Sequence, residues 1–307
     1  MGGKIVITPS SFGKVTSNAM DLLKQNFSEL KINDTGRKIP DSEVVSFYGD
    51  ADYAIAGLEL LSSNILECLP QLKIISRVGI GLDNIDLAYA NNNNIKVLNT
   101  PDPPTDAVSE ITITAALSLS RNIFNYNKDL HSSKWNKSVS SSLKNKNILI
   151  IGFGRIGQKV GEYFNFFQSN VFYYDPYIDS KNINATFKKV NFEEGLLNAD
   201  IISIHSSSPS ELIGNKEFKL MKNGVIILNS SRGCHINELE LIKNLKTKKV
   251  SSCWLDVFDQ EPYSGDLINL DNAILTPHIS TYTEICRQDM EMAAVKNLLN
   301  TIRDNGI

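Results

Sequence analysis

The chain has 307 residues, of which 42% are hydrophobic and 21% are charged, and its formal net charge at pH 7 is -3. This composition excludes disordered, collagen-like and disulfide-rich proteins, and the lack of a basic stripe argues against nucleic acid as a partner. The length predicts about two domains, each large enough to bury a core.

The cysteines are scattered along the sequence with no C-x-x-C pair, so we expect neither a metal site nor a redox dithiol. Residues 1–8 lack the apolar core of a signal peptide, and no apolar run approaches the roughly 18 residues of a membrane span. We therefore expect a cytoplasmic protein with no membrane partner and no bound metal.

Short β-branched runs bounded by turn residues recur along the chain. The predicted strands are Ile5–Thr8, Tyr53–Ala56, Lys73–Ser76, Ile95–Leu98, Asn147–Ile151, Asn170–Tyr174, Ile201–Ile204, Val225–Leu228, Ser251–Val257 and Ala273–Leu275. Helical periodicity lies between them at Ser17–Phe27, Thr105–Asn127, Arg155–Phe167 and Ile236–Leu245. Apolar strands that alternate with helices predict an α/β fold with doubly wound parallel sheets.

The densest proline cluster lies at residues 99–104, directly before the long predicted helix, and we interpret it as a crossing point between two domains. The polar segment 132–147 predicts a solvated connection into the next strand.

A glycine motif follows the predicted strand Asn147–Ile151 directly: Gly152-Phe153-Gly154-Arg155-Ile156-Gly157, with a predicted helix behind it. In this context the glycines allow a tight turn, a close approach of the backbone to a pyrophosphate, and packing of helix on strand. Asp175 lies about 20 residues further on, where an acid binds ribose hydroxyls and repels a 2′-phosphate. The motif therefore predicts NAD as the cofactor. A P-loop is excluded because Gln158 follows the third glycine.

Three candidate catalytic residues, Arg232, Glu261 and His278, each follow a predicted strand. Because ligands bind at the carboxyl ends of the strands in a doubly wound sheet, we expect the three to converge beside the cofactor. An Arg can bind a carboxylate with two parallel hydrogen bonds, and a His paired with a Glu is suited to general acid/base catalysis.

Several blocks of the sequence together resemble the D-isomer-specific 2-hydroxyacid dehydrogenase family, and especially its phosphoglycerate-dehydrogenase-like branch. These blocks are residues 75–86, 97–101, 107–110, 152–157, 174–176, 220–222, 231–233, 255–258, 261–262 and 276–278. Within this family, formate dehydrogenases have Gln in place of the His-pairing Glu, so Glu261 argues against that activity.

The resemblance implies a role for each candidate site residue. Arg232 would bind the carboxylate and carbonyl of the substrate, Glu261 would orient His278, and His278 would shuttle the proton. The remaining implied contacts are Gly152, Gly154, Arg155, Ile156, Gly157, Asp175, His205, Ser231 and Asp256 toward the cofactor, and Arg77, Val78 and Gly79, with Arg232 and His278, toward the substrate. Val78 and Gly79 would act through their backbone, and Asp256 would contact the nicotinamide amide.

The resemblance also implies a discontinuous architecture. Residues 1–99 and 281–307 would form a flavodoxin-like substrate-binding lid domain, and residues 100–280 an inserted Rossmann domain that binds NAD. The helix after Pro104 would form a homodimer. We expect no regulatory domain after residue 307.

The predicted function is an NAD-dependent D-2-hydroxyacid dehydrogenase that takes a small 2-hydroxy or 2-keto acid. The phosphoglycerate dehydrogenase reaction is slightly favoured, because Arg77 and Lys73 could offer positive charge to a phosphate. Alternatives are a hydroxypyruvate or glyoxylate reductase, another 2-keto acid reductase and, more distantly, an NAD-sensing protein without catalysis. Three features depart from the family pattern: residues 205–209, which form an unusual block, Ile279-Ser280, which follow the catalytic His where small glycines are common, and Gly57, which replaces an Arg.

Overall fold

The computed structural model describes residues 2–304, which form two compact α/β units. The first unit comprises Met1–Pro104 and Tyr282–Ile307, and the second comprises Thr105–Thr281. Every strand pair described in either unit is parallel. The predicted fold class, two doubly wound parallel sheets, is confirmed.

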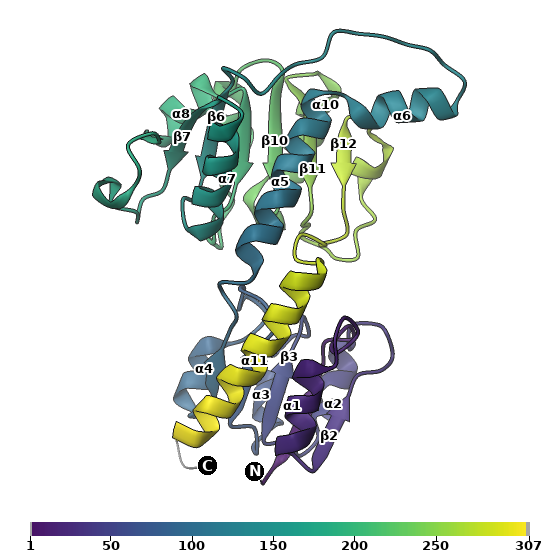
Figure 1. Cartoon of the computed structure of the whole chain (residues 1–307), viewed down its shortest axis with the longest axis vertical. Coiled ribbons are helices and arrows are strands. Elements are labelled where there is room, and N and C mark those ends of the chain that lie inside the picture. The colour runs from purple at the N-terminus through teal and green to yellow at the C-terminus, as the bar shows by residue number, and fades with distance from the viewer. Residues whose placement is uncertain (1, 305–307) are drawn as a thin grey trace. The chain divides into compact units, whose positions relative to one another are not determined.

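The sheet of the first unit has the strand order β2-β1-β3-β4-β5, the flavodoxin-like arrangement. Its elements are β1 (Lys4–Ile7), α1 (Asn18–Asn26), β2 (Glu29–Ile32), η1 (Asp41–Glu43), α2 (Val44–Tyr48), β3 (Tyr53–Ala56), α3 (Ser63–Glu67), β4 (Ile74–Arg77), α4 (Leu87–Asn92), β5 (Lys96–Leu98) and α11 (Glu284–Asp304). Helices α1 and α11 contact each other on one face of this sheet, and residues of α2, α3 and α4 join the apolar core on the other (Figure 1).

The sheet of the second unit has the order β12-β11-β10-β9-β6-β7-β8. Its elements are α5 (Pro104–Ser120), α6 (Ile123–His131), β6 (Asn147–Ile151), α7 (Arg155–Phe166), β7 (Asn170–Tyr174), η2 (Ser180–Asn182), β8 (Lys188–Lys189), α8 (Phe192–Asn198), β9 (Ile201–Ile204), α9 (Asn215–Leu220), β10 (Val225–Asn229), η3 (Gly233–His235), α10 (Glu238–Lys246), β11 (Val250–Leu255), η4 (Asp266–Asn269) and β12 (Ala273–Leu275). Residues of α5 and α7 line one apolar core, and residues of α8, α9 and α10 line the other (Figure 1). The strand order reverses between β6 and β9, and this switch point is where open α/β sheets bind ligands.

Differences from the predicted elements have local causes. The long predicted helix is divided into α5 and α6, because Asn122 adopts a left-handed conformation with φ 54° between them. Two edge strands, β2 and β8, were not predicted, since their side chains are mostly polar and exposed and lack an apolar run. The central strands were predicted because they are almost entirely buried, as in β9, whose residues all have buried side chains.

Among residues 2–304, no helix combines the length and the apolar character needed to cross a membrane.

Candidate active site

The glycine motif lies at the switch point of the second sheet, where doubly wound sheets have their ligand crevice. A Cβ on Gly152 would lie 2.6 Å from Ser206 N, and a Cβ on Gly157 would lie 2.2 Å from the Gly152 carbonyl oxygen. By contrast, a Cβ on Gly154 would meet no protein atom within 4 Å. Helix α7 begins at Arg155, so its first N–H groups lie beside this open space. These residues fit a dinucleotide, because the tight packing surrounds one open position where a pyrophosphate can approach the backbone.

Asp175 follows β7 and holds the turns around this crevice. Its Oδ2 accepts the Phe153 N–H at 2.8 Å, and its Oδ1 accepts the N–H groups of Tyr177 at 2.8 Å and Ile178 at 3.2 Å. Oδ1 uses both of its lone pairs in these bonds, but Oδ2 keeps one lone pair, so the predicted contact with a ribose hydroxyl stays compatible with them. The structure gives Asp175 a second role, which is to fix the backbone of the glycine motif.

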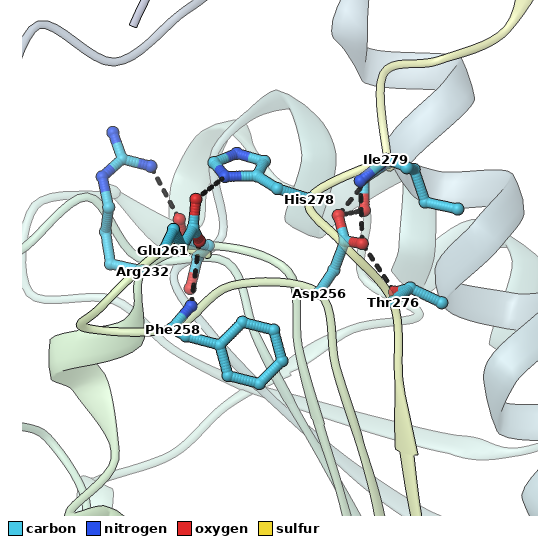
Figure 2. A network of polar contacts seen from close by, with 9 residues as sticks. Arg232, Asp256, Phe258, Glu261, Thr276, His278 and Ile279 are labelled. Atoms are coloured by element: carbon cyan, nitrogen blue, oxygen red, sulfur yellow. Dashed lines mark hydrogen bonds and ion pairs between the residues drawn. The ribbon is translucent and has the colours of Figure 1, made fainter. Parts of the chain in front are cut away.

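Glu261 and His278 form the central pair of the site (Figure 2). His278 Nδ1 lies 2.8 Å from Glu261 Oε2, and Glu261 Oε1 accepts the Phe258 N–H at 3.0 Å. Because the carboxylate can only accept, Nδ1 carries the proton and Nε2 is the nitrogen that can exchange a proton with a ligand. Both side chains are partly exposed, so the pair is open to solvent and to a substrate.

The backbone of His278 adopts the left-handed conformation, with φ 54°, directly after Pro277. Its N–H donates to the Thr276 carbonyl at 3.0 Å, which closes a tight turn. A non-glycine residue in this region is strained, and such residues cluster at functional sites.

Asp256, the residue directly after β11, binds this strained segment through hydrogen bonds. It is fully buried, and its Oδ1 accepts from Thr276 Oγ1 at 2.6 Å and from the Ile279 N–H at 2.9 Å. Its Oδ2 accepts from both the N–H and the hydroxyl of Ser280. Four donors from the chain therefore surround the carboxylate (Figure 2). The geometry makes Asp256 a support for His278, whereas its contact with nicotinamide stays a prediction.

Arg232 lies in the turn after β10, and β10 pairs with β11. One guanidinium nitrogen, Nη1, donates to the Ser231 carbonyl at 2.7 Å. Its neighbour Gly233 packs on the backbone of Phe258, where an added Cβ would lie 2.1 Å from the carbonyl carbon. Phe258 in turn binds Glu261, so close contacts run from the Arg232 turn to the His278 pair. The second unit thus brings Arg232, Glu261 and His278 together at the carboxyl ends of neighbouring strands.

His205 and Ser231, both predicted cofactor residues, turn their side chains inward. His205 Nε2 lies 2.8 Å from Ser203 Oγ, and burial lowers the pKa of His205 to about 3, so the ring is neutral near pH 7. The Ser231 hydroxyl lies 2.8 Å from Asn229 Oδ1. Their predicted contacts with a cofactor stay predictions.

The predicted substrate residues Arg77, Val78 and Gly79 lie in the first unit, at the carboxyl end of β4. The Val78 N–H donates to the Ala56 carbonyl at 2.9 Å, and the Gly79 N–H donates to Thr100 Oγ1 at 2.8 Å. Both N–H groups are bonded inside the unit, and the predicted contact of the Val78–Gly79 backbone with a substrate stays a prediction. The Arg77 guanidinium folds back over Gly79 and donates from Nη1 to the Val78 carbonyl at 3.1 Å.

Lys73 and Arg77, the two basic residues that could offer positive charge to a phosphate, lie at opposite ends of β4. Lys73 precedes β4 and Arg77 ends it, so their Cα atoms lie about 13 Å apart at roughly 3.3 Å per strand residue. Lys73 Nζ instead binds Asp52 Oδ1 at 2.8 Å, at the amino end of the strand.

Two supporting residues of the site were not predicted. Tyr263 stacks on Phe258 and donates to Glu238 Oε1 at 2.8 Å, which anchors the loop that carries Glu261. Asn229 accepts the Ser231 N–H and donates to the Arg232 carbonyl at 2.8 Å. Asn229 ends an otherwise apolar strand, and a polar side chain in that position was the available signal.

Comparisons with known proteins agree with this geometry. Residues 113–280 match the family model for the D-isomer specific 2-hydroxyacid dehydrogenase, NAD binding domain. A D-3-phosphoglycerate dehydrogenase of Archaeoglobus fulgidus is 30% identical over 93% of this chain. The chain spans about half of that relative, 55% of its length. A glyoxylate reductase of Thermococcus litoralis is 36% identical over 78% of this chain and 76% of its own length.

The crystal structure of the TT0316 protein from Thermus thermophilus is similar over 98% of this chain and 97% of its own, with a TM-score of 0.88 and 26% identity. The fold, the glycine crevice and the family match to the NAD binding domain all point to one assignment, and the resemblance predicted from the sequence is confirmed. The chain belongs to the D-isomer specific 2-hydroxyacid dehydrogenase family.

Proposed function

We propose that this chain is an NAD-dependent oxidoreductase that interconverts a 2-keto acid and a D-2-hydroxy acid. The observation that carries the proposal is the Glu261–His278 hydrogen bond of 2.8 Å, at the same sheet edge as the glycine crevice and Arg232. This edge combines a proton-transfer group, a carboxylate-binding group and a dinucleotide cradle.

The side chains divide the reaction between them. Arg232 binds the carboxylate of the acid and polarises the neighbouring carbonyl. His278 donates a proton from Nε2 to the carbonyl oxygen during reduction and removes it during oxidation, while Glu261 keeps the ring oriented through Nδ1. Bound NADH supplies the hydride. Asp256 and the turn at Pro277 hold the imidazole at the crevice.

For the substrate, we propose a small unphosphorylated 2-keto acid such as glyoxylate or hydroxypyruvate. The sequence favoured a phosphorylated substrate because of two basic residues, and one of them, Lys73, is paired with Asp52 at the opposite end of β4. The glyoxylate reductase relative supports the smaller substrate. The phosphoglycerate dehydrogenase relative is almost twice as long as the part that this chain matches.

A panel of 2-keto acids with NADH tests the proposal. We expect measurable kcat/KM with glyoxylate or hydroxypyruvate, and no gain with phosphohydroxypyruvate over hydroxypyruvate. A phosphate contact that operates raises kcat/KM by about tenfold to a hundredfold, so a gain of that size would overturn the substrate choice.

The control for the class of reaction is His278→Ala, which should bind NADH normally and lose about 10²-fold or more in kcat. A wild-type protein that binds NADH and reduces no keto acid in the panel would instead favour a binding protein without catalysis.

The proposal includes a homodimer formed through the predicted helix after Pro104, which comprises α5 and the start of α6, with the rest of α6 and the segment that follows it. Large apolar side chains are exposed there: Ile123, Phe124, Leu130, Trp135 and Val139. A cavity of about 410 Å³, lined in part by Phe124 and Val139, lies at the amino ends of β9 and β10. An exposed apolar set of this kind marks an interface, and a second copy would cover it. Sedimentation should show a dimer that Trp135→Asp dissociates, and a monomeric wild type would contradict this part.

The proposal also assigns cofactor binding to one unit and substrate binding to the other. The second unit matches the NAD binding domain model, so we assign the first unit, with Arg77, to the substrate-binding domain. A cytoplasmic location is part of the same proposal.

A further inference from the structure

His235 is a buried histidine outside the catalytic pair. It ends η3, three residues after Arg232, and none of its surface is exposed. Its Nδ1 lies 2.9 Å from Ser231 Oγ, and its Nε2 lies 2.8 Å from the Ser208 carbonyl oxygen. The imidazole therefore bridges two segments at the carboxyl edge of the second sheet: the loop after β9 and the turn after β10.

The hydrogen-bond partners determine where the protons lie. A carbonyl oxygen only accepts, so His235 Nε2 carries a hydrogen. The Ser231 hydroxyl lies between His235 Nδ1 at 2.9 Å and Asn229 Oδ1, to which it donates at 2.8 Å. Asn229 is fixed at the other side of Ser231, because Oδ1 accepts the Ser231 N–H and Nδ2 donates to the Arg232 carbonyl. The ring is thus linked through Ser231 to the backbone of Arg232.

The loop bound by His235 borders the dinucleotide crevice. Its start packs directly on the glycine motif, since a Cβ on Gly152 would lie 2.6 Å from Ser206 N and 2.7 Å from the His205 carbonyl oxygen. Its end is bound by the His235 backbone, whose carbonyl accepts the N–H groups of Leu212 and Ile213 at 2.9 Å each. The loop is therefore held at its end by the backbone of His235 and in its middle by the side chain.

We propose that His235 is a positioning residue with two separable functions. Through Nε2 it holds the loop 206–210 against the crevice, and through Nδ1 and Ser231 it fixes the turn that presents Arg232. The first function concerns cofactor binding alone. The second rests on the proposed function, in which Arg232 binds the carboxylate of the substrate.

Isosteric substitutions separate the two links. Gln places an amide near the position of Nε2 and Asn places one near Nδ1, so His235→Gln keeps the Ser208 bond and His235→Asn keeps the Ser231 bond. His235→Leu removes both. Two measurements need no substrate: NADH affinity from a fluorescence titration, and hydrogen exchange of the 206–210 amides without cofactor.

We expect His235→Leu and His235→Asn to weaken NADH binding by about tenfold and to speed exchange at 206–210, because the Ser208 carbonyl loses its buried partner. His235→Gln should stay near wild type in both measurements. In kinetics the pattern should reverse: His235→Gln should raise KM for the keto acid by about fivefold to tenfold, and His235→Asn should leave it near wild type.

Leu245→Ala is the matched control for lost stability. Leu245 is fully buried on α10, toward the amino edge of the sheet, and its truncation should lower Tm without changing NADH affinity below the unfolding temperature. If His235→Leu fails to fold, the Gln and Asn variants still decide between the two links.

The proposal is overturned if His235→Asn binds NADH within twofold of wild type and its 206–210 amides exchange hydrogen as slowly as those of wild type. It is also overturned if the Gln and Asn variants lose NADH affinity equally, since a general packing role of His235 would give that result. If the wild type reduces no keto acid but the NADH pattern holds, the proposed function fails and the role of His235 in cofactor binding stands.

Discussion

Replacing Glu261 by Gln puts a donor where the structure needs an acceptor. The two carboxylate oxygens face two donors, the Phe258 N–H at 3.0 Å and His278 Nδ1 at 2.8 Å. A Gln side chain offers one oxygen and one NH₂ group, so one of these positions must face the wrong group. If the oxygen stays with Phe258, the NH₂ faces Nδ1, and the neutral ring then carries its proton on Nε2. In that form Nε2 cannot accept a proton from a hydroxy acid.

The cost of this mismatch can be worked from the same geometry. A hydrogen bond to a charged group contributes about 1.5–3 kcal/mol. The side chains of His278 and Glu261 are 46% and 34% exposed, so solvent screening favours the low end of that range. A loss of about 1.5 kcal/mol in the transition state lowers kcat about tenfold.

The assay is steady-state kinetics in both directions, together with an NADH titration. We expect kcat to fall about tenfold while the NADH dissociation constant stays within twofold, because Glu261 lies outside the glycine crevice. Asp259→Asn is the matched control, since it removes an exposed carboxylate two residues away and should leave kcat unchanged. A Glu261→Gln enzyme with wild-type kcat would refute the orienting role, and so would an equal loss in the Asp259→Asn control.

Three further predictions concern the second unit. Gly154→Ala should fold normally and bind NADH about tenfold more weakly, since its Cβ fills the open position beside α7. Gly157→Ala should also lower Tm, because its Cβ would lie 2.2 Å from the Gly152 carbonyl oxygen. Burial would raise the pKa of Asp200, but hydrogen bonds from the Asn147 N–H and Lys222 Nζ outweigh it and lower the pKa. Stability from Asp200 is therefore complete above pH 3.8 and is lost as pH falls through the folded pKa, so in urea titrations Asp200→Asn should cost about 1 kcal/mol at pH 7 and progressively less as the pH falls below 3.8. Asp175→Ser should narrow the preference for NAD over NADP in kcat/KM and lower Tm, because the carboxylate also holds Phe153; equal kcat/KM for both cofactors in the wild type would contradict the first part.

The buried strands of both sheets could be predicted because their apolar runs are short, β-branched and bounded by turn residues. The edge strands β2 and β8 could not, since β8 (Lys188–Lys189), for example, has no apolar pattern and pairs only with β7. The break between α5 and α6 was missed for a different reason. Apolar periodicity continues across it, and only the left-handed backbone of Asn122 separates the two helices.

From sequence, we could predict which site residues lie close together only where their positions at the ends of strands determine it. Glu261 and His278 follow neighbouring strands, β11 and β12, so parallel pairing brings them to one edge. Arg77 and Lys73 flank a single strand, and a resemblance in sequence did not reveal that they lie at opposite ends. The hydrogen-bond partners of the Val78 and Gly79 N–H groups could not be predicted from sequence either. These partners, the Ala56 carbonyl and Thr100 Oγ1, lie more than twenty residues away along the chain.

Asp256 illustrates why a residue can matter to this site without touching a reactant. His278 has a left-handed backbone, a conformation that costs about 1–3 kcal/mol and persists only where its surroundings enforce it. The segment on both sides of His278 is bound to one buried carboxylate, through Thr276 before it and through Ile279 and Ser280 after it. A fully buried charge is itself costly unless donors surround it, and here the donors are the groups that must be held in place. The hydrogen bonds that stabilise the buried charge of Asp256 are therefore the same bonds that hold the strained backbone of His278 in place, and they fix the direction of the imidazole.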